Sequence, residues 1–286
     1  MRFELPLPPG FSFDAVVRSH GWYDLPPFSY DRSSGVLSYV APGPAPLTFR
    51  SSAGRLEATG PGRRSAALEA SARRIFSLDL ELSGFDAMLD EEPDLRRALQ
   101  RGGGRMLRAA TLFEDAVKML LTTNCSWAAT RGMVVRLVEL AGDGGAFPGP
   151  AAIARLRPRA LRERVRVGYR AEALLRFARR IDSGRLDLSD WERHDVSAEA
   201  VRASILAEHG FGPYAAEGLL RVLGRHDYLA IDSWVRKQFR KLHPGRAKTV
   251  DRAIARRYAR YGSYRGLALW LELTRHWHEG DAPGWD

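Results

Sequence analysis

The sequence predicts an α+β protein in which helices predominate. Two features lead to this prediction. Short apolar runs separated by Pro and Gly turns fill the first 60 residues, and capped apolar stripes of helical spacing fill most of the chain beyond residue 110. We therefore expect an antiparallel β-sheet domain over residues 1–85, followed by a helical region over residues 86–286.

The sheet domain is predicted to hold several short strands and one helix. Turn residues such as Pro-Pro and Ser-Ser-Gly separate the runs expected to form strands, which are residues 11–17, 35–40, 47–50 and 56–59. Ser65 is a suitable N-cap for a helix over residues 66–75. The alternating run 76–82 then predicts one more strand.

Helix start signals dominate the remaining chain. Thr111 and Glu114 form the pattern of a capping box for a helix over residues 112–121, and Ser126 can cap a helix over residues 127–141. Apolar spacing predicts further helices over residues 158–165, 170–181, 198–209, 214–223, 233–242, 249–261 and 264–277.

Charge and cysteine content narrow the function classes. The first 105 residues carry 13 basic and 13 acidic side chains, so the whole net charge of +10 lies in residues 106–286. A basic surface suits nucleic acid or an acidic membrane. A single cysteine, Cys125, excludes an intrachain disulfide framework and a four-cysteine metal cluster. The chain has neither a long apolar run nor a signal-peptide layout, so a cytoplasmic protein without membrane contact is expected.

Residues 206–214 have the pattern of a helical hairpin. One helix is expected to end at Gly210, and Pro213 stands where the first turn of the next helix tolerates proline. Glycines at 210 and 212 leave the turn unshielded, so a phosphate can approach the N–H groups at the start of the second helix. A tight helix–helix turn without a ligand is the alternative interpretation.

Asp232 follows the hairpin in an apolar setting and precedes a predicted helix. An N-cap and a catalytic carboxylate are both consistent with this position.

Gly210-Phe-Gly-Pro-Tyr-Ala-Ala together with Ala230-Ile-Asp-Ser-Trp resembles the signature of the helix-hairpin-helix (HhH-GPD) DNA glycosylase superfamily. The segments 76–82, 105–108 and 120–137 are similar to those of 8-oxoguanine DNA glycosylase and 3-methyladenine DNA glycosylase II. The resemblance implies a TATA-binding-protein-like sheet in front of two helical lobes. One lobe is expected over residues 112–224 and ends in the hairpin; the other combines residues 86–111 and 225–286.

By this resemblance Asp232 stabilises the oxocarbenium-like transition state and orients or deprotonates the attacking water. Bifunctional relatives carry a lysine at the start of the second hairpin helix, where this chain has Tyr214. The four lysines of the chain are Lys118, Lys237, Lys241 and Lys248. None lies between residues 118 and 237, so a small shift in the alignment does not place a lysine at position 214. The resemblance therefore implies a monofunctional enzyme that excises a base without lyase cleavage.

The resemblance also implies the residues that contact DNA. The base pocket is expected to include Trp127, Tyr214, Gly218, Trp234 and Trp270, and Tyr169 and Phe211 are also expected to line the cleft. The strand is expected to contact Asn124, Cys125, Ser126, Gly210, Phe211, Gly212 and Tyr214, with Asn124 or Cys125 as the wedge that fills the gap left by the flipped nucleotide. No cofactor is required, but relatives bind Na⁺ or K⁺ through hairpin carbonyls, here those of Leu206, Glu208 and Phe211.

The expected partner is double-stranded DNA that contains a damaged base, bound by a monomer. The aromatic residue at 214 favours an alkylated, cationic base, whereas the segment around Asn124 resembles the 8-oxoguanine branch. An 8-oxoguanine-type enzyme without the lysine, and a non-catalytic protein that binds distorted DNA, remain as alternatives.

Overall fold

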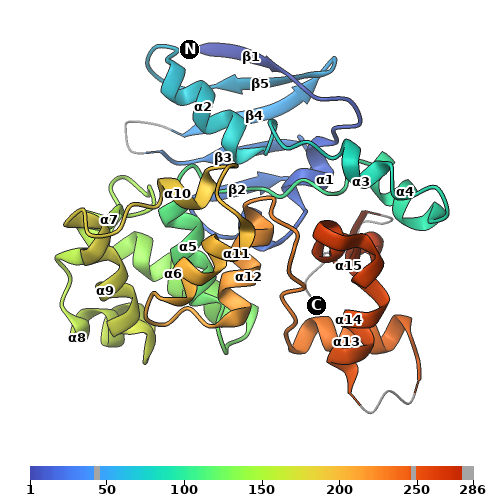
Figure 1. Cartoon of the computed structure of the whole chain (residues 1–286). Helices are drawn as coiled ribbons and strands as arrows, with labels where there is room; N and C mark the ends of the chain where they lie inside the picture. The colour runs from blue at the N-terminus through green and yellow to red at the C-terminus, as the bar shows by residue number, and fades with distance from the viewer. Residues whose placement is uncertain (42–45, 246–248, 279–286) are drawn as a thin grey trace.

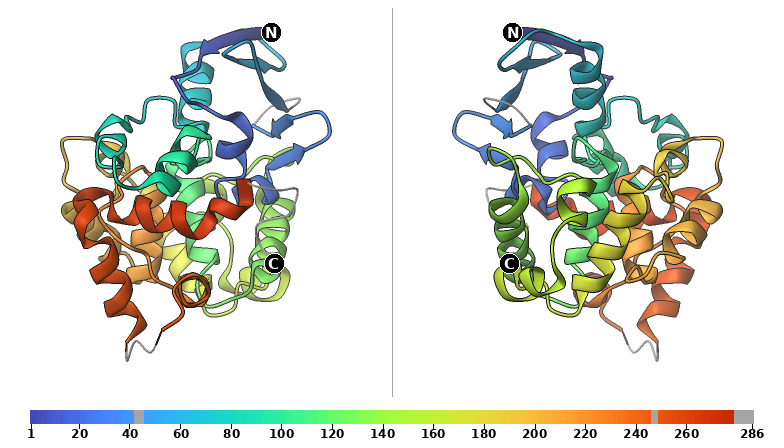
Figure 2. Two further views of the ribbon diagram at one scale, coloured as in Figure 1. Left: turned by 90° about the vertical axis from the view of Figure 1, so that its right-hand side faces the viewer. Right: turned by 90° about the vertical axis from the view of Figure 1, so that its left-hand side faces the viewer.

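In the computed structural model, which describes residues 1–41, 46–245 and 249–278, a five-stranded antiparallel sheet stands above a helical body (Figure 1). The expected α+β class with predominant helix is confirmed. The sheet projects from the helices when the molecule is viewed from either side (Figure 2). Within the described residues, no helix is both long and apolar enough to cross a bilayer.

The sheet has the strand order β1-β5-β4-β3-β2. Its strands are β1 (Arg2–Pro6), β2 (Phe28–Asp31), β3 (Val36–Tyr39), β4 (Leu47–Ser52) and β5 (Arg55–Thr59). The sequence correctly predicted β3, β4 and β5 but missed β1 and β2. Helix α2 (Ala66–Ile75) is capped by Ser65 as expected, and Phe76 at its end packs on Phe49 of the sheet at 5.2 Å between ring centroids.

Two predicted strands are wrong. Residues 11–17 form helix α1 (Phe13–Val17), because the Ser12 side chain accepts the N–H of Ala15 and caps a helical turn. Residues 76–82 form turns instead of a strand. Ser77 has a φ of +49°, and Arg105 donates to the carbonyl oxygens of Ser77 and Leu80 at 2.7 and 2.5 Å, so these groups are not available to a neighbouring strand.

The sheet shares one hydrophobic core with the helices that lie below it. These helices are α5 (Leu112–Leu121), α6 (Trp127–Ala141), α7 (Pro150–Ala154), α9 (Arg170–Asp182), α10 (Ser189–Glu192), α11 (Ala198–Leu206) and α12 (Pro213–Val222). Between α7 and α9, helix α8 (Pro158–Ala160) buries no residue, but the π-helical turn Leu161–Val165 after it adds Leu161 and Val165 to the core. Thr111 caps α5 as predicted. The Glu114 carboxylate does not complete the capping box, since it accepts a hydrogen bond from Lys118 at 2.6 Å instead.

A second core lies on the other side of the molecule (Figure 1). It joins segments that are distant in sequence: α3 (Ser83–Asp86), α4 (Pro93–Gln100), α13 (Ser233–Leu242), α14 (Val250–Tyr258) and α15 (Arg265–Thr274). Short 3₁₀ turns at Ala259–Tyr264 and Arg275–His278 flank α15, so the helices predicted over residues 249–261 and 264–277 are shorter than expected. Phe85 and Tyr261 pack together here at 6.3 Å between ring centroids.

Candidate active site

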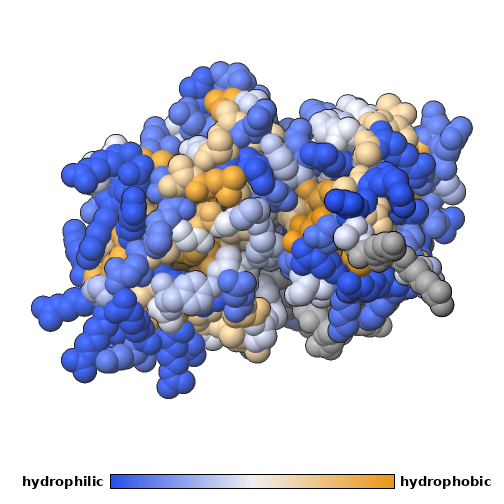
Figure 3. Space-filling view, turned by 60° about the horizontal axis from the view of Figure 1, so that its bottom comes forward, coloured by the Kyte–Doolittle hydropathy of each residue, from blue (hydrophilic) through white to orange (hydrophobic). Residues whose placement is uncertain are grey.

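A cavity of about 1000 Å³ opens where the two helical groups meet. Its wall combines the 3₁₀ turn Gly21–Asp24, the loop between α5 and α6, the hairpin before α12, the start of α13, and Trp270 of α15. Figure 3 shows this side of the molecule, where hydrophobic residues gather toward the middle and hydrophilic residues cover the flanks. The volume is large enough for one flipped nucleobase with its sugar.

Asp232 lies on the wall of this cavity as the N-cap of α13. Its Oδ1 accepts the N–H of Val235 at 2.7 Å, and the residue is half-buried. The turn before it is held from α12, because the N–H of Ala230, which has a φ of +48°, donates to Glu217 at 3.0 Å. Arg202 in turn pairs with Glu217 at 2.8 Å. Glu217 therefore positions the catalytic candidate, a role that the sequence did not reveal.

The hairpin turn runs along the rim of the cavity between α11 and α12. Gly210 has a φ of +93°, and a Cβ at this position would lie 2.4 Å from the Cβ of Ala173. Gly212 meets nothing within 4 Å and is the N-cap of α12, with no side-chain cap from the described residues. Phe211 is buried and packs on Phe177 at 5.1 Å between ring centroids. The start of α12 is thus open at Gly212, where no side chain covers the backbone.

Aromatic side chains form much of the wall. All six aromatic residues expected to line the cleft do so: Trp127, Tyr169, Phe211, Tyr214, Trp234 and Trp270. Trp127 donates from Nε1 to Asp24 at 3.0 Å. Burial raises the pKa of the Tyr214 hydroxyl, and the negative charge of Asp232 adds to this shift. Tyr214 is therefore a neutral phenol at neutral pH.

The loop between α5 and α6 places Asn124 at the mouth of the cavity. Asn124 is exposed, has a φ of +49°, and donates from Nδ2 to the hydroxyl of Tyr169 at 3.1 Å. Arg170 donates to the carbonyl oxygen of Thr123 and, at 3.2 Å, to its hydroxyl, which fixes the loop from α9. Cys125 and Gly218 also line the cavity.

Three predicted site residues lie away from the cavity wall. Ser126 caps α6 by accepting the N–H of Ala129 at 3.3 Å. Leu206 and Glu208, expected to offer carbonyl oxygens to a cation, lie behind the turn. The carbonyl oxygen of Glu208 accepts the N–H of Phe211 at 3.1 Å, which uses one of its two lone pairs. The remaining lone pair fits the expected role, so binding of a monovalent cation stays a prediction.

Several polar residues on the wall were not expected from the sequence, among them Arg221 and His20. Gly218 and Arg221 follow Tyr214 by four and seven residues, so all three lie on the same face of α12. This spacing could have predicted from the sequence that Arg221 lines the cavity. Burial lowers the pKa of His20 to about 4, so its ring is neutral at neutral pH. The His20 Nε2–H donates to the carbonyl oxygen of Leu107 at 2.7 Å, which leaves Nδ1 as an acceptor.

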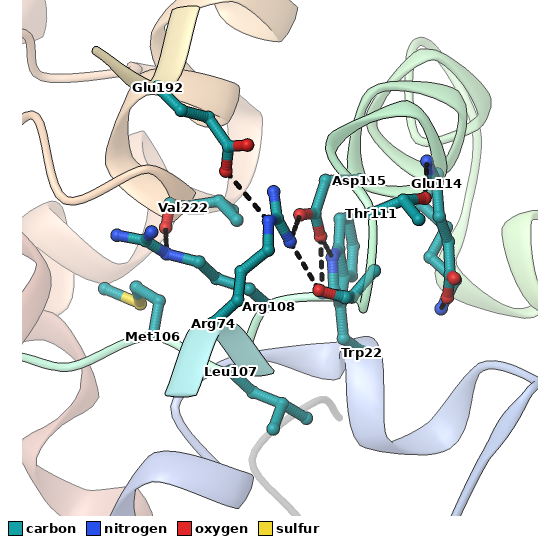
Figure 4. Close-up of polar contacts among 12 residues, drawn as sticks. Trp22, Arg74, Met106, Leu107, Arg108, Thr111, Glu114, Asp115, Glu192 and Val222 are labelled. Carbon is teal, nitrogen blue, oxygen red and sulfur yellow. Dashed lines mark hydrogen bonds and ion pairs between the residues drawn. The ribbon is translucent and has the colours of Figure 1, made fainter. Parts of the chain in front are cut away.

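Trp22 of the cavity wall is held by a network of hydrogen bonds and ion pairs around Asp115 (Figure 4). Asp115 is fully buried and accepts from Trp22 Nε1 at 2.7 Å and from the N–H of Ala109 at 2.9 Å. Arg74 pairs with Asp115 and with Glu192, both at 2.8 Å. The wall residue Trp22 is thereby fixed to α5 and α2.

No lysine of the described residues lines the cavity. Lys118 is fully buried and paired with Glu114 at 2.6 Å, Lys237 and Lys241 are exposed on α13, and Lys248 lies outside the described residues. The described residues also contain no group of three or more His, Cys, Asp or Glu side chains placed to hold a metal.

The fold formed by the sheet and the two helical groups is also found in solved structures of DNA glycosylases. Three solved structures with this fold are similar to the chain. An apo 8-oxoguanine glycosylase/lyase from Clostridium acetobutylicum has a TM-score of 0.74 and 16% identity, covering 95% of each chain. A 3-methyladenine DNA glycosylase from Archaeoglobus fulgidus has a TM-score of 0.71 and 22% identity, covering 96% of this chain and 98% of that one.

The third is the 3-methyladenine DNA glycosylase Mag1 from Schizosaccharomyces pombe in complex with abasic DNA. It has a TM-score of 0.54 and 18% identity, covering 72% of this chain and 95% of that one. No family model matches the sequence, and no curated protein matches it significantly.

Proposed function

We propose that the protein is a monofunctional DNA glycosylase, which removes a damaged base from double-stranded DNA. The observation that carries this proposal is the position of Asp232, on the wall of an aromatic-lined cavity whose rim is the glycine hairpin. The hairpin N–H groups bind backbone phosphate, and the cavity receives the flipped base. The residues proposed to contact the strand are Asn124, Cys125, Gly210, Phe211, Gly212 and Tyr214.

The chemistry follows from the carboxylate. The C1′–N bond breaks, its electron pair leaves with the base, and the oxygen of a water molecule bonds to C1′. Positive charge develops on the sugar, and the Asp232 carboxylate stabilises it and accepts a proton from the water. Because Tyr214 stands at the start of α12 and no described lysine reaches the cavity, the abasic product is released without a Schiff base.

The substitution Asp232→Asn tests this mechanism. Asparagine is an equally good N-cap, so α13 should keep its stability while the charge is lost. We expect the single-turnover rate of base release to fall roughly 100- to 1000-fold, a loss typical of removing one electrostatic transition-state contact. DNA affinity should be unchanged. Asp90→Asn, which removes an exposed carboxylate paired with Arg96 away from the cavity, is the matched control and should keep full activity.

Undiminished base release by Asp232→Asn would disprove the mechanism. Two further measurements test whether the enzyme is monofunctional. We expect the product strand to break only after treatment with alkali. We also expect no protein–DNA adduct on borohydride reduction. A wild-type protein that binds lesion duplexes but releases no base from a broad damage panel would instead be a non-catalytic binder of distorted DNA.

A further inference from the structure

Arg221 is a charged residue in an unusual place. It lies on the cavity wall, on the face of α12 that also carries Tyr214 and Gly218, and only 8% of it is exposed. Its guanidinium carbon lies 4.0 Å from the centre of the Trp270 ring. The charge is thus fixed over an aromatic face inside the cavity that is proposed to receive the base.

The guanidinium group of Arg221 has one donor nitrogen that no described residue satisfies. Across the described parts of the chain, Nη1 of Arg221 is buried and finds no hydrogen-bond partner. Burial lowers the pKa of this group, while Tyr214, Asp232 and Glu217 act in the opposite direction. An arginine side chain stays protonated in proteins, so the cavity wall carries a positive charge with an unused donor. Such a group destabilises a fold and is retained where a ligand supplies the acceptor.

The Trp270 ring contacts the Arg221 guanidinium, so this face of the ring is not free to stack on a base. Its Nε1 donates to the carbonyl oxygen of Ser19 at 3.1 Å, and its ring packs against Trp234 and Trp277 at 5.7 and 5.6 Å between centroids. Arg221 lies over one face of the ring, and Trp270 as a whole residue is only 7% exposed. Trp127, Tyr214 and Trp234 are the half-buried aromatic residues of the wall that are left to contact a base.

Resting on the proposed glycosylase function, we propose that Arg221 is a specificity-determining residue, which selects a neutral flipped base that carries an exocyclic carbonyl oxygen. Its guanidinium donates to that oxygen. A cationic alkylated base has no use for this donor and is repelled by the charge. The selected class therefore differs from the alkylated bases that the aromatic residue at position 214 suggests.

Leaving-group chemistry strengthens this assignment. When the C1′–N bond of a neutral base breaks, the electron pair that stays on the base is delocalised onto its carbonyl oxygen. A guanidinium N–H directed at that oxygen stabilises the developing negative charge, so it accelerates the chemical step as well as binding. A cationic base leaves as a neutral molecule and needs no such help.

The test compares three duplexes, which carry hypoxanthine, 1,N⁶-ethenoadenine or 3-methyladenine. Hypoxanthine is neutral and has a carbonyl oxygen, ethenoadenine is neutral and has none, and 3-methyladenine is cationic and has none. For Arg221→Met we expect the single-turnover rate on hypoxanthine to fall roughly 10- to 100-fold, as for loss of a charged hydrogen bond. The rates on the other two bases should be unchanged or higher.

Stability provides a second readout. Arg221→Met should raise the Tm, because the variant removes a buried charge whose Nη1 has no hydrogen-bond partner in the described chain. Arg136→Met is the control. Arg136 lies away from the cavity and donates to the carbonyl oxygen of Val165 at 2.9 Å, so its loss should lower the Tm and leave the base preference unchanged.

An equal fall of all three rates would overturn the proposal, since Arg221 would then act through Asp232 or the fold. An unchanged hypoxanthine rate would overturn it as well. A wild-type protein that releases only 3-methyladenine would refute this inference while leaving the glycosylase function in place. Release of no base at all from the wider damage panel would refute that function itself.

Discussion

Among individual residues, Asp115 holds Trp22 of the cavity wall in place. It is fully buried, and its two oxygens accept from the side chains of Trp22 and Arg74 and from the backbone of Ala109. An ion pair in this setting contributes little beyond its desolvation cost, but the loss of one partner leaves the other charge buried and unpaired.

We expect Asp115→Ala to lower the free energy of unfolding by about 3–5 kcal/mol, measured by urea denaturation. The control is Asp79→Ala, which removes the partner of Arg73 in an ion pair whose two side chains are 41% and 62% exposed. This exposed pair should contribute about 0–1 kcal/mol. Equal effects of the two substitutions would show that the buried network does not support the fold.

Among the elements, the hairpin between α11 and α12 contains two glycines with different surroundings. Gly210 has a left-handed backbone and lies against Ala173 of α9, whereas Gly212 has a φ of −87° and open space around it. Only the first position requires glycine for the fold. The second leaves room for something outside the protein.

Gly210→Ala should lower the free energy of unfolding by about 2 kcal/mol or more, because of its φ and the contact with Ala173. Gly212→Ala should leave stability nearly unchanged and weaken DNA binding, because a methyl group stands where a phosphate approaches the α12 N–H groups. Thermal denaturation and fluorescence-anisotropy titrations check the two effects. Full DNA affinity in Gly212→Ala would contradict phosphate binding at this turn.

At the scale of the whole molecule, charge is distributed unevenly along the chain. The excess of +10 lies entirely beyond residue 105, in the part that contains the hairpin and α13. Exposed Lys237 is on α13, one residue after Arg236 of the cavity wall. Residues 1–105, which include the sheet and the exposed Arg63, carry no net charge.

We expect DNA affinity to fall steeply with salt, because phosphate neutralisation releases counterions. Lys237→Ala should reduce the slope of log Kd against log salt by roughly 1, whereas Arg63→Ala should not change it. Titrations at several salt concentrations measure both slopes. A flat response of the wild-type protein would argue against nucleic acid as the partner.

Local sequence determined much of this protein. The caps at Ser65, Thr111, Ser126 and Asp232, and the Gly210–Pro213 turn, were predictable because each depends on residues three or four positions apart. The same turn and Asp232 pointed to the fold and to the candidate site. The division of the helices into lobes over residues 112–224 and over 86–111 with 225–286 stays a prediction.

Contacts between distant residues decided the rest. Residues 76–82 form turns and not a strand because Arg105, more than 20 positions away, donates hydrogen bonds to the carbonyl oxygens of Ser77 and Leu80. The roles of Glu217 and Arg221 depended likewise on which side of α12 faces Ala230 and Trp270. The neighbours of a residue in sequence determine its backbone preference. Only tertiary packing determines which charged groups are buried away from solvent, and the chemistry of the cavity depends on those groups.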